Sequence, residues 1–144
     1  MKQSPLVSIA LCTYNGAAYL TEQLDTLVSQ TYSFIEIIAV DDCSTDETFS
    51  ILTAYAAKYP QLKIYQNESN TGFLANFEKA LKLCNGELIA LCDQDDLWDP
   101  EKITLQVEAI KDNIFIYHDS EFIHEDGTTM NKKNVGYYEP LPGR

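Results

Sequence analysis

The chain reads Gly86-Glu-Leu-Ile-Ala-Leu-Cys-Asp-Gln-Asp-Asp-Leu-Trp-Asp-Pro100 across its most informative stretch. The apolar run Leu88–Cys92 is too short for a helix, so it predicts a strand buried on both faces of a sheet. Asp99 stands where it can cap the next helix, and Pro100 stands at the first position of that helix. The stretch therefore predicts a strand, an acidic loop and a helix in direct succession.

The acidic loop carries three carboxylates, those of Asp93, Asp95 and Asp96, at the end of the buried strand. Their mutual repulsion is costly unless a cation or a hydrogen-bond donor relieves it. Mg²⁺ and Mn²⁺ prefer oxygen ligands of this kind. A solvated acidic turn without function would carry the same residues. The rest of the sequence is therefore needed to choose between a metal site and such a turn.

Composition limits the choice of protein class. With 144 residues, of which 45% are hydrophobic, the chain is long enough for one domain with a substantial core. The formal net charge is −12, with only 10 Lys and Arg residues. Nucleic-acid binding requires basic patches, so we expect no nucleic-acid partner.

The cysteines and the apolar runs indicate a compartment. Cys12, Cys43, Cys84 and Cys92 form no C-x-x-C pair, so free thiols in a reducing compartment are expected. No apolar run approaches the roughly 18 residues of a membrane span, and the N-terminus lacks the core of a signal peptide. We expect a cytoplasmic protein.

Apolar runs and helical patterns alternate along the whole chain. Two strands, Leu6–Cys12 and Phe34–Val40, are apolar except for Ser8 and Glu36. Helical spacing predicts four helices with these inward residues: Leu20, Leu24, Leu27 and Val28; Phe49, Leu52, Ala56 and Tyr59; Phe73, Phe77, Leu81 and Cys84; Ile103, Val107 and Ile110. The other expected strands are Leu62–Tyr65, Leu88–Cys92 and Ile114–Tyr117.

Boundaries follow from capping and turn signals. Ser44 and Glu47 have the spacing of a capping box before the second helix. Asp126-Gly127 predicts a turn, and a polar tail rich in Gly and Pro follows it. We therefore expect one domain over residues 1–127 and a tail over residues 128–144.

Alternating strands and helices predict an α/β fold, a Rossmann-like parallel sheet sandwiched by helices. In such sheets ligands bind beyond the carboxyl ends of the strands, where the strand order reverses. The clusters Thr13-Tyr14-Asn15, Asp41-Asp42 and Asp93-x-Asp95-Asp96 all follow predicted strands. The sequence thus predicts one polar site at that edge of the sheet.

The residues at this site favour a nucleotide diphosphate over other ligands. A metal held by few carboxylates completes its shell with water and substrate phosphates, and it neutralises charge on a diphosphate leaving group. The chain has no Walker-type loop and no G-x-G-x-x-G after its first strand, which disfavours an ATPase and a dinucleotide oxidoreductase.

Four motifs follow one another along the chain: Val7-Ser-Ile-Ala-Leu-Cys-Thr-Tyr-Asn-Gly16, Val40-Asp-Asp-Cys-Ser-Thr-Asp46, Asn70-Thr-Gly72 and Asp93-Gln-Asp-Asp-Leu-Trp98. In this order, from Leu6 to about Gly127, they resemble the family 2 glycosyltransferases, which have the GT-A fold. The resemblance implies transfer of a sugar from a nucleotide-diphosphate donor to a glycan or lipid-linked acceptor, with inversion and with Mg²⁺ or Mn²⁺. Polysaccharide biosynthesis is the implied setting.

The resemblance also implies site residues. Thr13, Tyr14 and Asn15 would line the nucleotide pocket, and Asp41 and Asp42 would meet the base. In the D-x-D motif, Asp95 would be the metal ligand and Asp93 its companion, while Asp96 would support the loop or approach the donor sugar.

Two features distinguish this chain from many members that it resembles. Ala75-Asn76 stands where they have Arg-Asn near the phosphates. The Asp-Gln-Asp-Asp form, with Asn-x-Gly-Phe before it, is similar to a branch associated with rhamnosyl transfer. A dTDP-linked donor is therefore expected as much as a UDP-linked one.

The resembling family continues beyond this length into a part that supplies acceptor contacts and the general base, for which no residue matches here. We expect a GT-A fold truncated on its C-terminal side, with self-association through exposed apolar surface and peripheral membrane association of the full-length protein. The alternative is a non-catalytic nucleotide-sugar-binding module or a truncated, inactive homologue. A phosphatase or receiver domain fits less well. A phosphatase of this type has a second aspartate two positions after its nucleophile and then Thr or Val, whereas Asp95 is followed by Asp96-Leu97. A receiver domain has a Lys at the end of its fifth strand, where this chain has Tyr117-His118.

Overall fold

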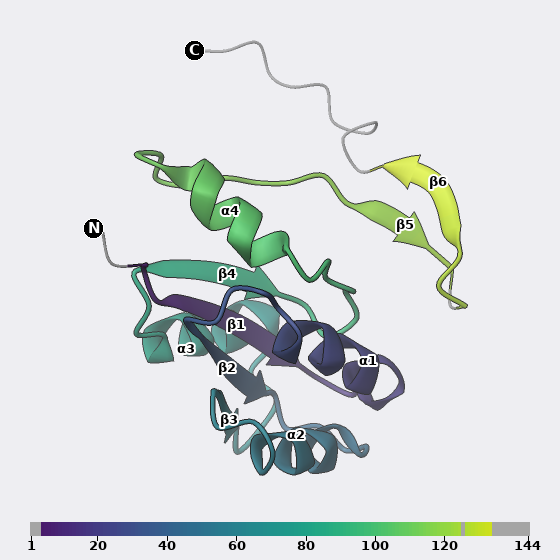
Figure 1. Ribbon diagram of the computed structural model, residues 1–144. Coiled ribbons are helices and arrows are strands. Elements are labelled where there is room, and N and C mark those ends of the chain that lie inside the picture. Colours follow the sequence, from purple (N-terminus) through teal and green to yellow (C-terminus); the bar gives the residue numbers. More distant parts are fainter. Residues whose placement is uncertain (1–3, 125, 134–144) are drawn as a thin grey trace. The chain divides into compact units, whose positions relative to one another are not determined.

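The computed structural model describes residues 4–124 and 126–133 (Figure 1). The chain divides between Leu105 and Gln106 into two compact units. No helix in the described residues is long and apolar enough to cross a membrane. The elements are β1 (Val7–Thr13), α1 (Ala17–Val28), β2 (Ile35–Asp41), α2 (Thr48–Ala56), β3 (Leu62–Gln66), α3 (Phe73–Leu83), β4 (Leu88–Cys92), α4 (Lys102–Ile110), β5 (Glu121–Ile123) and β6 (Thr129–Lys133).

The first unit is built on a parallel sheet with the strand order β3-β2-β1-β4. All seven residues of β1 are buried, and β2 is buried except at Ile35, which is half-buried. Such continuous apolar strands are typical of parallel sheets covered on both faces. The predicted α/β architecture, with a parallel sheet between helices, is confirmed.

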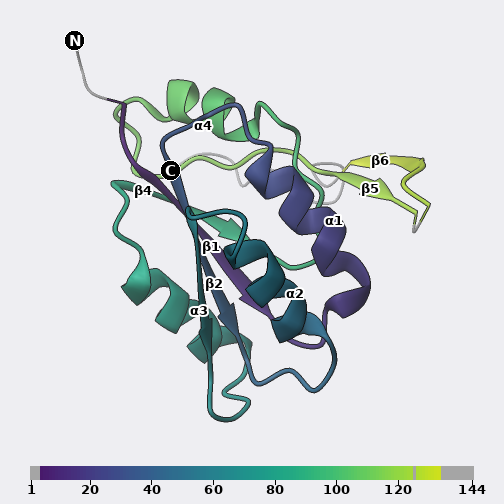
Figure 2. The ribbon, with the colours of Figure 1, turned by 60° about the horizontal axis from the view of Figure 1, so that its bottom comes forward.

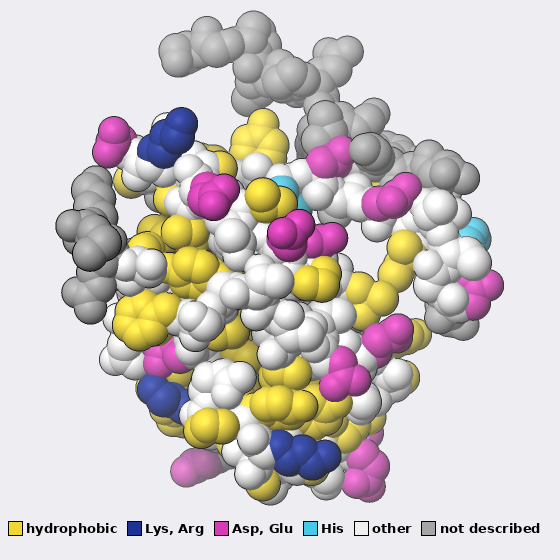
Figure 3. All heavy atoms as spheres, viewed as in Figure 1, with side chains coloured by type: hydrophobic (Ala, Val, Ile, Leu, Met, Phe, Trp, Pro, Cys, Tyr) yellow, Lys and Arg dark blue, Asp and Glu magenta, His cyan; other side chains and the backbone are white. Residues whose placement is uncertain are grey.

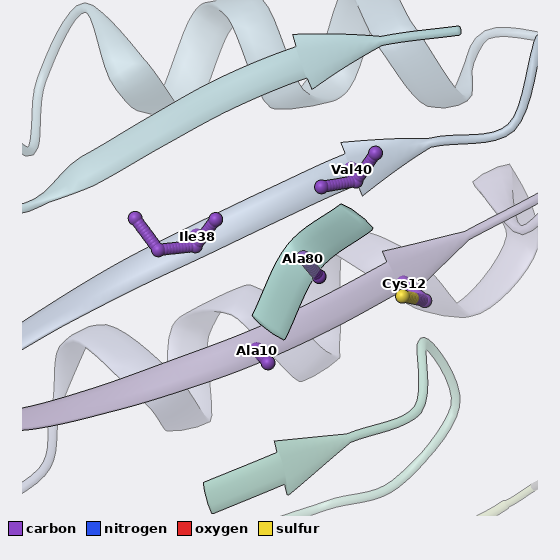
Figure 4. Close-up of a cluster of buried hydrophobic side chains, with 5 residues drawn as sticks. All are labelled: Ala10, Cys12, Ile38, Val40 and Ala80. Carbon is purple, nitrogen blue, oxygen red and sulfur yellow. The ribbon is translucent and has the colours of Figure 1, made fainter. Parts of the chain in front are cut away.

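Helix α3 covers one face of the sheet. Figure 4 shows the buried cluster on this face, which consists of Ala10, Cys12, Ile38, Val40 and Ala80. Phe77, Leu83 and Cys84 of the α3 region pack against this cluster and are partly buried.

Helices α1 and α2 cover the opposite face, as Figure 2 shows. Successive residues of a strand point to opposite faces, so Ile9 and Leu11 of β1 point away from α3. The helices bury Leu20, Leu24, Leu27 and Leu52 completely. The inward residues predicted for α1 are therefore confirmed, apart from Val28, which is half-buried.

Strand β4 forms where it was predicted, but it is not buried on both faces. Ile89 and Leu91 are 47% and 62% exposed, and their register partners in β1 are Ser8 and Ala10. Helix α3 packs over β1 and β2, so it leaves the side chains on this last strand uncovered. The expectation of double burial is wrong here, because an apolar run does not reveal its place in the sheet.

The buried side of α3 differs from the predicted stripe. Asn76 and Ala80 are the buried residues of this helix, whereas Phe73 and Leu81 are exposed. The amide of Asn76 donates to the Val40 carbonyl of β2 at 2.9 Å. This hydrogen bond places a polar residue against the sheet, which apolar spacing could not predict.

The capping box predicted for Ser44 and Glu47 does not form. Ser44 Oγ donates instead to Asp41, and α2 begins at Thr48, whose backbone N–H donates to Asp46 Oδ1 at 3.0 Å. Asp46 therefore satisfies an N–H group at the start of α2. Helix α2 ends at Ala56, three residues before the predicted inward Tyr59.

The start of α4 is close to the prediction. The carboxylate of Asp99 accepts a hydrogen bond from the backbone N–H of Glu101 at 2.8 Å, and the helix begins at Lys102. Ile103 is fully buried, while Val107 and Ile110 are half-buried.

The second unit contains an antiparallel hairpin of β5 and β6. The predicted turn at Asp126-Gly127 is confirmed: Gly127 has a φ of 78°, and the Asp126 carboxylate accepts the Thr128 N–H at 2.9 Å. Residues 134–144, most of the predicted tail, lie outside the described residues. The predicted domain boundary after Gly127 stays a prediction.

The strand expected at Ile114–Tyr117 is absent from the described structure, which has no regular element between α4 and β5. Ile114 and Phe115 are exposed. A strand needs a neighbour for its backbone N–H and C=O groups, and a run of four apolar residues does not specify one. The prediction of a fifth strand at this position is wrong for that reason.

Acidic residues dominate the charge of the molecule, with 22 Asp and Glu against 10 Lys and Arg. Figure 3 shows acidic side chains spread over one face, where the few basic side chains stand apart from one another. Such a face offers a nucleic-acid backbone little to bind, although the absence of a nucleic-acid partner stays a prediction.

Candidate functional site

The strand order places a crevice at the carboxyl ends of β1 and β4. The chain runs from β1 through β2 to β3 on one side and then returns to β4 on the other side of β1. Open parallel sheets bind ligands at such a switch point. A pocket of about 610 Å³ lies there, lined by Cys12, Thr13, Tyr14, Asp42, Asn70, Gly72, Phe73, Asn76, Asp93, Gln94 and Asp95.

The pocket brings together residues from all three predicted polar clusters. Five of the residues that the sequence singled out line it, namely Thr13, Tyr14, Asp42, Asp93 and Asp95, while their contacts with a nucleotide or metal stay predictions. The other three candidates, Asn15, Asp41 and Asp96, are not among the lining residues. Gln94 and Phe73, which also line the pocket, were given no function from the sequence, and Asn76 was noted only as a position near the phosphates in the resembling proteins.

Asp41 supports the site from behind. It is fully buried, and its carboxylate accepts hydrogen bonds from Thr13 Oγ1 at 3.0 Å, from the Ser44 N–H at 3.0 Å and from Gln66 Nε2 at 3.1 Å. These donors belong to β1, the β2–α2 loop and β3. Asp41 therefore holds three segments together at the carboxyl edge of the sheet.

Asp42 holds the loop that closes one side of the pocket. Its Oδ1 accepts the Thr71 N–H at 2.8 Å and Asn67 Nδ2 at 2.7 Å, and its Oδ2 accepts the Gly72 N–H at 2.8 Å. Burial would raise the pKa of Asp42, but the hydrogen bonds from Thr71, Asn67 and Gly72 outweigh burial and lower it. Asp42 is thus a carboxylate at neutral pH, and Oδ2 has capacity for a further donor.

The backbone at Gly72 explains the glycine of the Asn-Thr-Gly motif. Gly72 has a φ of 87°, a conformation that side-chain-bearing residues rarely adopt. This conformation directs the Gly72 N–H to Asp42 Oδ2 and begins α3 directly afterwards.

Two buried amides extend this network into α3. Asn67 Nδ2 donates to Asn76 Oδ1 at 2.9 Å, and Lys79 Nζ donates to Asn67 Oδ1 at 2.7 Å. Asn76 is 2% exposed. In the sequence, its burial is indicated only by its place as a polar residue among the apolar positions of the predicted helix. Ala75, where many resembling proteins have Arg, is exposed.

The Asp93–Asp96 loop concentrates negative charge beside the pocket. Burial raises the pKa of Asp93, and the charges of Asp96 and Asp95 raise it further. A cation would relieve this repulsion. In residues 4–124 and 126–133, no three His, Cys, Asp or Glu side chains converge to form a metal site by themselves, so a metal here would need ligands from water or substrate.

The thiol of Cys12 lies in the wall of the pocket. Burial, followed by the charges of Asp93 and Asp42, raises the pKa of Cys12 to about 12. Because the thiolate is the nucleophilic form, Cys12 contributes to packing rather than to covalent chemistry.

Trp98 is 4% exposed and packs inside the fold. It therefore anchors the end of the loop that carries the D-x-D motif. The ammonium of Lys102 lies 3.6 Å from the centre of its ring, in a cation–π contact. This geometry gives Trp98 a structural function rather than a sugar-stacking one.

Asn15 joins two loops beside the pocket. Its N–H donates to Ser44 Oγ at 2.9 Å, and its Oδ1 accepts the Thr45 N–H at 2.8 Å. Asn15 has a φ of 48°, a region where Asn is enriched. The structure therefore gives Asn15 a conformational function, and the side chain predicted to line the nucleotide pocket is bonded to the neighbouring loop instead.

Replacing Asn15 tests this function. We expect Asn15→Ala to lower the free energy of unfolding by about 1–2 kcal/mol, because it removes the hydrogen bond to Thr45 and strains a positive φ. Asn15→Gly keeps the backbone relaxed, so it should lose less stability. Chemical denaturation of both variants measures the difference; equal losses would show that backbone strain contributes nothing.

Comparison with protein families and curated proteins gives a consistent result. The family model described as Glycosyl transferase family 2 matches residues 8–140. The putative teichuronic acid biosynthesis glycosyltransferase TuaG of Bacillus subtilis is 32% identical over 130 residues, which cover 89% of this chain and 52% of that protein. An uncharacterized protein of Mycobacterium tuberculosis is 39% identical over 127 residues, which cover 84% of this chain and 37% of that protein. The chain thus spans well under two thirds of these relatives.

Solved structures agree with the sheet topology. Staphylococcus aureus TarS (residues 1–349), solved with UDP, is 34% identical with a TM-score of 0.68, over 74% of this chain and 32% of that chain. A mannosyltransferase of Pyrobaculum calidifontis, solved with GDP-Man and Mn²⁺, is 28% identical with a TM-score of 0.72, over 78% of this chain and 34% of that chain.

Proposed function

Because the chain belongs to glycosyl transferase family 2, we propose that it is the donor-binding part of an inverting, metal-assisted glycosyltransferase. The observation that carries this proposal is the pocket at the switch point between β1 and β4, which Asp93 and Asp95 line. Structures similar to this chain were solved with UDP, UDP-GlcNAc or GDP-Man. A nucleotide-diphosphate sugar is accordingly the proposed ligand.

The pocket residues divide into two groups in this proposal. Thr13, Tyr14 and Asp42 contact the nucleoside, and the free capacity of Asp42 Oδ2 suits an N–H of the base. Asp41 and Asn15 act by holding these residues in place. On the other side of the pocket, the acidic loop lies beside the diphosphate.

A divalent cation fits the chemistry of the acidic loop. Asp95 would hold Mg²⁺ or Mn²⁺ together with Asp93, and Asp96 would support the loop; these hard cations take carboxylate, water and phosphate oxygens. Burial, followed by the charges of Asp96 and Asp95, raises the pKa of Asp93, and a bound cation would favour its charged form. When bound, the cation would offset charge on the departing diphosphate.

The proposed reaction is a single displacement at the anomeric carbon. The acceptor hydroxyl forms the new C–O bond while the bond to the diphosphate breaks, and a general base takes the hydroxyl proton. Displacement from the face opposite the leaving group inverts the configuration. We assign the general base to no described residue, because no residue that lines the pocket matches the general base of the family.

The alternative is a module that binds the nucleotide sugar without transferring it. The hydrogen bonds that fix Asp41 and Asp42 in place would equally suit a protein that only binds the nucleotide sugar. Transfer of the sugar to an acceptor glycan, measured by release of free nucleotide diphosphate, distinguishes the two functions.

Calorimetric titration of UDP, dTDP and GDP, with and without Mn²⁺, tests donor binding. We expect one nucleotide to bind in a manner that depends on Mn²⁺, and the preferred base then identifies the donor class. If the folded chain, verified by circular dichroism, binds none of the three nucleotides with or without Mn²⁺, the proposed function is wrong.

A further inference from the structure

Gln94, the middle residue of the D-x-D motif, connects the acidic loop to the end of β1. Its Oε1 accepts the Tyr14 N–H at 2.9 Å, and its Nε2 donates to the Tyr14 carbonyl at 3.1 Å. One side-chain amide thus satisfies both backbone groups of a residue that lies 80 positions away in the sequence. Both residues line the pocket.

Gly16 provides the space for this amide. A Cβ atom at Gly16 would lie 2.1 Å from Gln94 Oε1 and 2.3 Å from Gln94 Cδ. The φ of Gly16 is −106°, so alanine is compatible with the backbone here. The close approach of Gln94 is therefore the obstacle to a side chain at this position.

The acidic loop is held on both sides of Gln94. Before it, Gln23 Nε2 donates to the Asp93 carbonyl at 3.2 Å, and after it, the Trp98 N–H donates to Thr26 Oγ1 at 3.3 Å. Asp95 and Asp96 stand between these anchors, and the like charges of the loop push it outward when no cation is bound. The two hydrogen bonds to Tyr14 oppose that displacement.

We infer that Gln94 is a positioning residue, which fastens the acidic loop to Tyr14 and holds Asp93 and Asp95 ready for a metal–diphosphate group. The inference rests on the proposed function of this pocket. It assigns to the middle position of the motif a function that the two carboxylates do not have, and it makes Gly16 a partner in that function. A loop held in its binding geometry loses less conformational freedom on binding.

A double-mutant cycle tests the inference through the variants Gln94→Ala, Gly16→Ala and their combination. Each single variant should weaken UDP binding in the presence of Mn²⁺ by roughly five- to tenfold, the effect of losing two exposed hydrogen bonds. The double variant should bind no more weakly than Gln94→Ala, because the added methyl group no longer displaces an amide. If another nucleotide is the preferred ligand, it replaces UDP.

Two further readouts separate positioning from general stability. The Mn²⁺ concentration that gives half-maximal UDP binding should rise in both single variants, while their midpoints of thermal unfolding stay close to that of the unchanged chain. Amide hydrogen exchange at Tyr14 should become faster in both variants, and this measurement needs no nucleotide. Gln61→Ala, at the amino end of β3, is the matched control and should change none of these quantities.

The possible outcomes distinguish this inference from the proposed function. Unchanged affinity in Gln94→Ala, or independent losses that multiply in the double variant, would overturn the inference while the proposed function stands. Failure of the unchanged chain to bind any nucleotide would overturn both. Unaltered exchange at Tyr14 in Gln94→Ala would show that the contact itself contributes nothing.

Discussion

Replacing Asp95 by asparagine is expected to abolish Mn²⁺-dependent binding of UDP, with an affinity loss of about a hundredfold or more. Asparagine keeps the size and one oxygen of aspartate but lacks the negative charge, and a site with few carboxylates depends on that charge to hold a hard divalent cation. Asp95 lines the pocket, so the lost charge faces the proposed diphosphate. Calorimetry with and without Mn²⁺ measures the effect.

The control for this variant is Asp112→Asn, which removes the same charge from an exposed residue of the second unit. It should leave UDP binding unchanged, because exposed charges outside a binding site are screened by salt. Metal-dependent binding that survives in Asp95→Asn would mean that Asp95 is not a metal ligand. The proposal would then have to rely on Asp93 alone.

The location of the site could be predicted from the sequence because parallel strands bring their carboxyl ends to one edge. Thr13, Asp42 and Asp93 each follow an apolar run, and alternation with helices implied that these runs are parallel. Their meeting in one pocket follows from topology. It required no knowledge of any side-chain contact.

The division of tasks within each cluster could not be predicted in this way. Asp41 and Asp42 are adjacent, yet Asp41 pairs with Thr13 across the register and is buried behind the pocket, while Asp42 lines it. Which neighbour points inward depends on strand register, and a one-residue shift reverses the answer. The sequence contains that register only implicitly.

Gln94 and the exposure of β4 escaped prediction for related reasons. The hydrogen bonds of Gln94 reach Tyr14 across 80 positions, a distance at which local spacing carries no information. Leu91 lies in a run as apolar as that of β1, but it is exposed because α3 does not extend over it. Both features depend on the packing of elements that are remote in sequence.

Ser8 and Glu36, the polar residues that interrupt the apolar runs of β1 and β2, are hydrogen-bond partners. A substitution of Glu36 has the largest expected effect on stability. Ser8 and Glu36 face each other in the register of β1 and β2, and Ser8 Oγ donates to Glu36 Oε1 at 2.7 Å. The Asn85 N–H donates to the same oxygen at 2.7 Å, and Lys63 Nζ lies 2.8 Å from Oε2. Glu36 is 6% exposed, so its charge depends on these donors.

This environment changes the protonation of Glu36. Burial alone would raise the pKa, but the hydrogen bonds from Lys63, Ser8 and Asn85 outweigh burial and lower the pKa of Glu36 from 4.5 to about 2. The unfolded chain therefore takes up this proton at a higher pH than the folded chain does. The resulting stabilisation is fully present above about pH 4.5 and is lost as the pH falls toward 2.

We expect Glu36→Gln to lower the free energy of unfolding at pH 7 by about 2–3 kcal/mol, since glutamine keeps the shape but loses the charge-assisted hydrogen bonds. Urea denaturation at a series of pH values measures the difference between the variant and the unchanged chain. That difference should shrink as the pH falls from about 4.5 toward 2, because protonation then removes the same charge from the unchanged chain.

Glu78→Gln is the matched control, since Glu78 also pairs with a lysine but lies exposed on the surface of α3 beside Lys82. Exposed ion pairs contribute little to stability, so this variant should unfold like the unchanged chain at pH 7. A difference for Glu36→Gln that stays constant down to pH 2 would show that packing, not charge, stabilises this position. A difference for Glu36→Gln that disappears toward pH 2 would place this acid sensitivity at the amino end of the two central strands, remote from the pocket at the carboxyl ends of β1 and β4.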